Sequence, residues 1–294
     1  MFPFFAKCKQ PTPPEPAVTQ SRPALVEYEI IASVLSDVGC QRATNEDSAS
    51  FFRPHDDALR ASKGSLAIVA DGMGGHAAGE VASRIAVEVI RRAYYESKLS
   101  ASEALQKAFV EANEAIYRAS QVDRRLAGMG TTCTALVLQG GAALCAHVGD
   151  SRLYLQRNGA LYQLSEDHSF VREMVKHGML TNDQAREHSE KNVILRALGT
   201  RPKVEVEMWE KPFSVQPGDA LLLCSDGLSD LVTDEEIQTI VGAEEPHLAA
   251  EKLIALARER GGHDNITVGV LQLQTAREAT ATPLPTTRET EALV

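Results

Sequence analysis

Short apolar runs recur along the middle of the chain and have the length and composition of β-strands. They are rich in Ile, Val and Leu, and they cover residues 27–35, 65–71, 131–139, 142–150, 152–156, 160–164, 220–226 and 265–273. The run at 65–71 does not alternate with polar residues, which predicts a strand buried on both faces. The pairs Gly140-Gly141 and Asn158-Gly159 separate neighbouring runs and favour tight hairpin turns, so we expect antiparallel pairing.

Between these runs, apolar residues at helical spacing predict helices. From about residue 77 to residue 96 they recur every four residues, at Val81, Ile85, Val89 and Ala93, and the next helix repeats this spacing at Leu105, Phe109, Ala112 and Ile116. A later helix is predicted at 247–260. Residues 165–200 are polar and predicted to be helical, with a capping box from Thr181 to Gln184. Together these elements predict an α+β layered domain in which helices cover an antiparallel core.

The two ends of the chain differ from the middle. Six of the 13 prolines precede residue 24, and residues 275–294 are rich in Thr, Pro and Glu without periodicity. We therefore predict flexible tails at 1–24 and 275–294 and one folded domain at 25–274. No internal repeat is visible in this domain.

Charge and cysteine content narrow the class of protein. A net charge of −10 argues against a nucleic-acid groove, which needs a basic face. The five cysteines are scattered without a CxxC pair, which favours a reducing compartment over disulfides or zinc. No stretch has the length of a signal peptide core or a membrane span. We expect a cytoplasmic protein that acts as a monomer.

The stretch VADGMGGHAAGE at 69–80 has the glycine spacing of a phosphate-binding P-loop, with Gly74 and Gly79 bracketing four residues. A P-loop continues with Lys and then Ser or Thr, whereas this chain has Glu80 and Val81. A carboxylate at that position would repel a triphosphate. The acid Asp71 and its glycines therefore need another explanation.

Four acids share one kind of position, at the ends of predicted strands. They are Asp71, Asp150, Asp226 and Asp264, and three of them adjoin a glycine. A single acid at a strand end is more often a turn former or a helix cap. Four carboxylates gathered at one sheet edge would repel one another unless divalent cations lay between them, and Mg²⁺ and Mn²⁺ prefer oxygen ligands.

Six motifs occur in order across the predicted domain: RATNEDS at 42–48, DGMGGH at 71–76, GTT at 130–132, VGDSRLY at 148–154, CSDGLSD at 224–230 and GHDNIT at 262–267. In these motifs the chain resembles the bacterial branch of the metal-dependent PPM phosphatases, which are protein phosphatase 2C-like. The resemblance implies a central sandwich of two antiparallel β-sheets flanked by helices. It also implies that residues 165–200, hereafter the flap, lie beside the active site.

The same resemblance implies roles for individual residues. Asp71 would bridge two metal ions, and the carbonyl of Gly72 would bind one of them. Glu46 would contact the second metal largely through water, with Asp47 supporting it from behind. Asp226 and Asp264 would hold the first metal. A weaker third site would use Asp150, Asp226 and Asp230, and Arg42 would bind the substrate phosphate, since its planar fork can grip two oxygens.

These roles predict an enzyme that hydrolyses phosphoserine and phosphothreonine on proteins with Mn²⁺ or Mg²⁺. Two cations about 3.5 to 4 Å apart acidify a water and orient the phosphoryl group for in-line attack. The expected partners are phosphorylated proteins, including a Ser/Thr kinase and its substrates. Two alternatives remain open: a catalytically weak regulatory scaffold, or a switch phosphatase dedicated to one anti-sigma-type partner.

Met73 departs from the eukaryotic pattern, which has a histidine after the DG pair as a candidate general acid. A thioether cannot donate a proton to the leaving alkoxide. Three sources could replace it: His76, a water on the third metal held by Asp150, or bulk solvent. We favour the metal-bound water, and we expect His76, His147 and His263 to be structural.

Overall fold

Two antiparallel sheets face each other at the centre of the molecule. The computed structural model describes residues 28–74 and 78–275, so the predicted tails, apart from Thr275, and His76 lie outside the described residues. The first sheet has five strands in the order β1 (Tyr28–Asp37), β12 (Ile266–Thr275), β11 (Ala220–Cys224), β7 (Arg152–Arg157) and β8 (Ala160–Gln163). The second sheet has seven strands, with the central path β10 (Phe213–Ser214), β6 (Ala142–Val148), β5 (Cys133–Gln139), β3 (Ser65–Met73) and β2 (Asp47–Phe52). Off this path, β4 (Gly130–Thr131) pairs with β3, and β9 (Glu207–Met208) pairs with β6.

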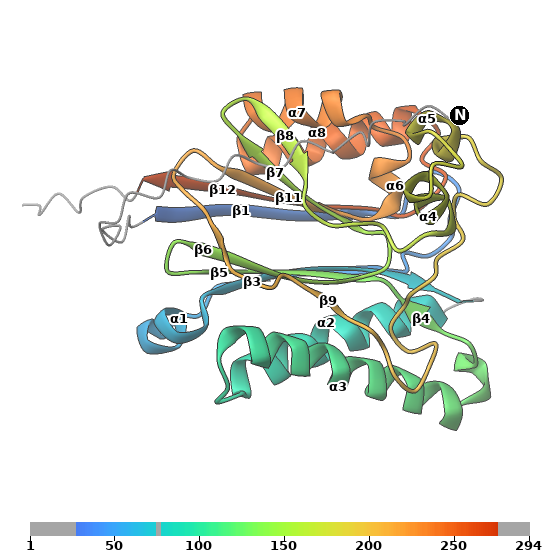
Figure 1. The fold of residues 1–294 in the computed structure, drawn as a ribbon, viewed down its shortest axis with the longest axis horizontal. Helices are drawn as coiled ribbons and strands as arrows, with labels where there is room; N and C mark the ends of the chain where they lie inside the picture. The colour runs from blue at the N-terminus through green and yellow to red at the C-terminus, as the bar shows by residue number, and fades with distance from the viewer. Residues whose placement is uncertain (1–27, 75–77, 276–294) are drawn as a thin grey trace, which may run out of the picture.

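Helices cover the outer faces of both sheets (Figure 1). On the seven-stranded sheet lie α2 (Ala78–Glu96) and α3 (Ala101–Val122), and α1 (Asp57–Lys63) and the 3₁₀ turn η1 (Arg124–Leu126) flank them. On the five-stranded sheet lie α6 (Asp226–Ser229), α7 (Asp234–Ala243) and α8 (Pro246–Glu259). The short helices α4 (Phe170–Lys176) and α5 (Asn182–Arg186) belong to the flap. The predicted α+β sandwich of two antiparallel sheets is confirmed.

The apolar runs lack alternation because both faces of the central strands are buried. In β11, Leu221 and Leu223 pack between the two sheets, whereas Leu222 and Cys224 pack under the outer helices. In β3, Ser65 to Ala70 are all buried, as predicted. A strand with an apolar layer on each side needs apolar residues at every position, which produces a continuous run.

The hairpin predictions are confirmed by the backbone. Gly140 and Gly141 have φ of 56° and 82°, and Asn158 and Gly159 have φ of 53° and 77°. Positive φ at both central residues is the condition for a tight hairpin turn between right-twisted strands. The two turns join β5 to β6 and β7 to β8.

The most deeply buried face of α2 is formed by residues one position further along the chain than predicted. Ala82, Ala86 and Ile90 are fully buried, while Val81, Ile85 and Val89 are only partly buried against the same cluster. Two of these three deepest positions are small alanines, which let the helix axis approach the sheet closely, and the third is Ile90. The predicted face of α3, with Leu105, Phe109, Ala112 and Ile116, is fully buried.

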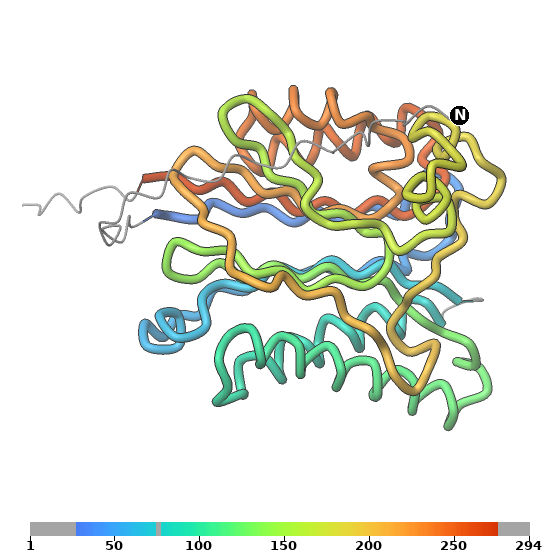
Figure 2. The backbone as a smooth tube through the Cα atoms, in the orientation of Figure 1, coloured from blue at the N-terminus to red at the C-terminus, as the bar shows by residue number. Residues whose placement is uncertain are grey.

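The flap is less helical than predicted. Only α4 and α5 are helical within 165–200, and the predicted capping box from Thr181 to Gln184 is present at the start of α5. After α5 the backbone crosses to the layer of the seven-stranded sheet, where Leu198 bridges to Thr131 (Figure 2). No helix among the described residues is both long and apolar enough to cross a membrane.

Candidate active site

The candidate site begins with two acids that face each other across neighbouring strands. Asp47 starts β2 and Asp71 lies near the end of β3, and the two residues are register partners in the antiparallel pair. Like charges directly opposite each other destabilise a sheet. Asp47 is stabilised by two hydroxyls of the other sheet: Ser225 donates to its Oδ2 over 2.8 Å and Thr267 over 2.6 Å. Asp47 therefore ties the two sheets together at the site end, which suits the supporting role expected of it.

Asp71, Asp226 and Asp264 come from three different strand ends that meet here. The carboxyls of Asp71 and Asp226 lie within hydrogen-bond reach of each other. Asp226 is also close enough to Asp264 for the charge of Asp264 to raise the pKa of Asp226. The fold thus gathers the three acids that were expected to hold metal.

Gly72 lies in a cradle that a side chain would fill. A Cβ at this position would be 2.2 Å from the carbonyl oxygen of Gly79 and 2.5 Å from that of Glu46. A Cβ at Gly79 would in turn meet the Glu46 carboxylate at 2.7 Å. Gly72 and Gly79 therefore let the first turn of α2 approach β3 and Glu46 closely, which gives Gly79 of the P-loop-like stretch a packing role.

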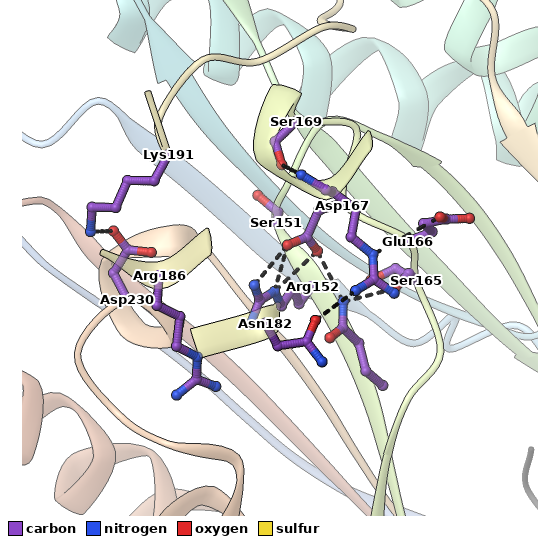
Figure 3. Close-up of polar contacts among 12 residues, drawn as sticks. Ser151, Arg152, Ser165, Glu166, Asp167, Ser169, Asn182, Arg186, Lys191 and Asp230 are labelled. Carbon is purple, nitrogen blue, oxygen red and sulfur yellow. Dashed lines mark hydrogen bonds and ion pairs between the residues drawn. The ribbon is translucent and has the colours of Figure 1, made fainter. Parts of the chain in front are cut away.

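Asp150 and Asp230 extend the acidic cluster toward the flap. Asp150 is 8% exposed, and burial, followed by the charges of nearby acids that include Asp226 and Asp230, raises its pKa well above the usual range. Asp230 accepts a hydrogen bond from the ammonium of Lys191 at 2.5 Å (Figure 3). His263 lies 4.0 Å from the same oxygen. Asp150, Asp226 and Asp230, expected together at a third site, are neighbours in the structure.

Burial and mutual repulsion raise the pKa values of these acids. Burial, followed by the charges of Asp47, Asp226 and Asp150, raises the pKa of Asp71 well above its usual range. Burial, followed by Asp230 and Asp264, raises the pKa of Asp226 to about 6. Burial also raises the pKa of Asp47 to about 7, against the hydrogen bonds from Thr267 and Ser225. The protein alone therefore leaves the negative charge of this cluster under-compensated.

The donor set fits hard divalent cations. The Oδ1 atoms of Asp47, Asp150 and Asp226 are buried without a hydrogen-bond partner, and buried carboxylate oxygens otherwise find one. Within residues 28–74 and 78–275, no three His, Cys, Asp or Glu side chains lie close enough together to enclose a metal ion by themselves. Such an enclosure is not required, because Mg²⁺ keeps several waters and uses only one or two carboxylates. An all-oxygen group of this kind suits Mg²⁺ or Mn²⁺.

Arg42 pairs with Asp264, whereas Lys191 pairs with Asp230. The Nη2 of Arg42 donates to Asp264 Oδ2 over 2.8 Å, and the Arg42 side chain is 48% exposed. The guanidinium therefore keeps most of its N–H groups available on the solvent side of the acids.

Several positioning residues were present in the motifs but had no role in the sequence analysis. Asn265 accepts from the Glu46 backbone N–H over 2.7 Å and donates to the carbonyls of Val38 and Thr44, so it holds the loop that carries Arg42 and Glu46. Thr132 Oγ1 accepts from the Asp71 N–H. The signal for Asn265 was its place directly after Asp264 in GHDNIT.

Two buried histidines position the turn that presents Asp150. His147 contacts Thr134 and the carbonyl of Gly149, and His168 Nδ1 accepts from the Gly149 N–H. Burial, followed by the charge of His168, lowers the pKa of His147 to about 4, so this ring is neutral near pH 7. The structural assignment of His147 agrees with these contacts, whereas His263 lies 4.0 Å from Asp230 at the cluster edge.

Comparison with known proteins agrees with this geometry. The protein phosphatase 2C family model matches residues 52–268. The serine/threonine phosphatase stp of Listeria innocua is 40% identical over 257 residues, covering 84% of this chain and 99% of the relative. The protein phosphatase PhpP of Streptococcus pneumoniae is 36% identical over 247 residues, covering 82% of this chain and 96% of that protein.

The chain is also similar to a solved structure of the catalytic domain of the serine/threonine protein phosphatase PstP in complex with two manganese ions. The TM-score is 0.73 and the sequence identity is 36%, and the match covers 84% of this chain and 100% of that one. The fold and these similarities define a protein serine/threonine phosphatase. The chain belongs to the protein phosphatase 2C family.

Proposed function

We propose that this protein hydrolyses phosphoserine and phosphothreonine on proteins by the attack of water, with two divalent cations, Mn²⁺ or Mg²⁺, held by the acidic cluster. Its substrates are a Ser/Thr kinase and the proteins that this kinase phosphorylates. The observation that carries the proposal is the gathering of Asp71, Asp226 and Asp264 from separate strand ends, with buried carboxylate oxygens left unpartnered. The two manganese ions in the PstP structure support it.

The residues that would hold the cations divide into a central and a flap-side group. Asp71, the carbonyl of Gly72, Asp226 and Asp264 form the central group, and Glu46 acts through water. Asp150, Asp226 and Asp230 form the flap-side group, which we propose as a weaker third site. When bound, divalent cations acidify water and neutralise charge on a transferring phosphoryl group.

The residues around the cluster keep these ligands in place. Asn265 and Ser83 fix the backbone of Glu46, the latter by donating to its carbonyl over 2.6 Å. Thr131 Oγ1 donates to the Asp71 carbonyl over 2.8 Å. Because the backbones on both sides of the cluster are pinned by buried hydrogen bonds, little reorganisation is required when substrate binds.

Arg42 binds the phosphate of the substrate in this proposal. A phosphorylated side chain brings about −1.5 to −2 charges to an acidic protein, so local positive charge is needed to attract it. The bond from Arg42 to Asp264 orients the guanidinium while its remaining N–H groups stay available for phosphate oxygens.

A metal-dependence experiment tests the proposal. Release of phosphate from a phosphothreonine peptide should stop on exhaustive chelation and return when Mn²⁺ is added. Asp71→Asn should lower kcat by at least about a hundredfold, since it removes charge at the cation pair. The matched control is Asp57→Asn, an exposed acid in the first turn of α1, which should behave as the wild type. Turnover that survives chelation would contradict the proposal.

A further inference from the structure

A cavity of about 170 Å³ lies between the acidic cluster and the flap. Asp150, Asp226 and Asp230 line one side of it, and residues of α4, α5 and the segment after α5 line the other. Asp226 also lies within hydrogen-bond reach of Asp71, so the cavity begins directly beside the proposed reaction site. A peptide bound at that site would pass the cavity with the residues that flank its phosphorylated side chain.

The flap side of this cavity is basic. Arg172 from α4, Arg186 from α5 and Lys191 all line it, and Asn182 and Arg186 project from the same short helix in Figure 3. Arg186 is 49% exposed, so the cavity opens to solvent at α5. Asp150, Asp226 and Asp230 are the acids proposed to hold cations, and cation binding would neutralise them. Of the other two acids that line the cavity, Asp167 is paired with Arg152 at 2.7 Å and Asp234 lies 3.9 Å from Arg186. The charge left in the cavity would then be mainly that of the basic flap residues.

Arg172 has hydrogen-bonding capacity that the protein does not use. Its Nε is buried without a hydrogen-bond partner, and its Nη1 reaches Asn182 Oδ1 only at 3.4 Å. The nearest carboxylate, that of Glu166, lies 4.0 Å from Nε and is already paired with Lys176 at 2.9 Å. A guanidinium has five N–H donors, and leaving one buried and unpaired is costly.

Arg152, one of the three arginines that line the cavity, differs from Arg172 and Arg186 in its hydrogen bonding. Arg152 donates to both oxygens of Asp167 and to the hydroxyl of Tyr154, so its fork is occupied. Arg186 lies 3.9 Å from Asp234, beyond hydrogen-bond distance. Arg172 and Arg186 therefore have only long ion pairs, of 4.0 and 3.9 Å, and keep N–H groups available to an anion, whereas Arg152 is structural.

We infer that this cavity is a specificity subsite for an anionic side chain, a carboxylate or a second phosphate, close in sequence to the phosphorylated residue of the substrate. Arg172 is its main ligand, Arg186 assists it, and Lys191 contributes charge from its position on Asp230. The inference rests on the proposed function, because it concerns the substrates of the same site. Such a subsite would make the enzyme prefer some phosphoproteins over others, which the acids that hold the cations cannot do by themselves.

A set of phosphothreonine peptides tests the subsite. The reference peptide has alanine around the phosphothreonine, and each variant peptide carries Asp, Glu or a second phosphothreonine at one flanking position in turn. At the position that reaches the cavity, the anionic peptide should have a kcat/KM at least about tenfold higher than the reference, as expected for one charge-assisted hydrogen bond to a half-buried arginine. Asp and phosphothreonine at this position show whether a carboxylate suffices or a phosphate is needed. Raising the salt concentration should reduce the preference.

Variants of the flap locate the effect. Arg172→Met should bring the rates for anionic and reference peptides together while leaving the reference rate unchanged, and Arg172→Lys should restore only part of the preference, since it loses the fork. Arg186→Met should weaken the preference, and this variant tests the subsite if Arg172→Met does not fold. Arg91→Met, on the opposite helical layer, is the matched control and should keep the full preference.

A binding measurement separates this inference from the proposed function. The dephosphorylated anionic peptide cannot react, and its fluorescence anisotropy should report tighter binding to the wild type than to Arg172→Met. Equal rates for every peptide with the wild type, together with metal-dependent turnover of the reference, would overturn the subsite and leave the phosphatase intact. No turnover of any peptide would contradict the proposed function, and the anisotropy difference would still decide the subsite.

Discussion

The acidic cluster predicts that removing a charge from it stabilises the metal-free protein. In Asp226→Asn, a carboxyl with a pKa raised from 3.8 to about 6 becomes a neutral amide that can donate to Asp71. A raised pKa in the folded state means that the contribution of Asp226 to stability is fully present below about pH 4 and lost as the pH rises through 6. A shift of about two units corresponds to about 3 kcal/mol. The variant should avoid this loss.

Urea unfolding followed by circular dichroism measures the effect. In chelator at pH 7.5, Asp226→Asn should have a free energy of unfolding higher than the wild type by up to about 3 kcal/mol. Near pH 3 the two proteins should converge, because this lies below the unfolded pKa of 3.8 and Asp226 is mostly protonated in both folded and unfolded wild type.

Added Mn²⁺ should reverse the order of stability. A ligand at a thousandfold excess over its Kd stabilises the folded state by about 4 kcal/mol, and the variant has lost part of the site. The exposed-acid control, Asp57→Asn, should follow the wild type in all conditions. A metal-free Asp226→Asn protein less stable than the wild type at pH 7.5 would refute the reasoning, since the charge of Asp226 would then be compensated by its protein neighbours.

Three further predictions concern other parts of the molecule. Arg42→Ala should mainly raise KM for a phosphopeptide, and an unchanged KM in steady-state assays would remove Arg42 from phosphate binding. Asp150→Asn should lower the ratio of phosphothreonine to aryl phosphate turnover at saturating Mn²⁺, because a water on a cation held by Asp150 is the expected donor of the proton that only the alkoxide needs. The same ratio in both proteins would argue for another donor. Arg157→Met should cost about 3 to 5 kcal/mol in urea unfolding, since it leaves Asp219, which is 1% exposed, without its bidentate partner. The double variant with Asp219→Leu should recover most of that loss, and a double variant as unstable as the single one would show that the cost is not the unpaired charge.

Much of the fold could be predicted because local patterns decide it. The central strands are apolar at every position, and the glycine and Asn-Gly turns require positive φ, so both were visible in the sequence. By contrast, β2 reads DSASFF with half-buried residues and was not predicted. This segment is a strand because it pairs with β3, and a pattern within the segment itself cannot show that pairing. The helices α1 and α7 were also missed, and the flap was predicted to be more helical than it is.

The candidate site divides in the same way. The sequence by itself determined which acids follow strands and which motifs surround them, because the residues that end a strand are adjacent to it in the chain. Only the tertiary structure decided that Asp47 faces Asp71, that Asn265 holds the loop of Glu46, and that Arg172 faces a cavity beside Asp226. These relations join residues far apart in the chain. Burial in the packed sheets then raises the pKa values of the acids, so their need for cations is a property of the fold.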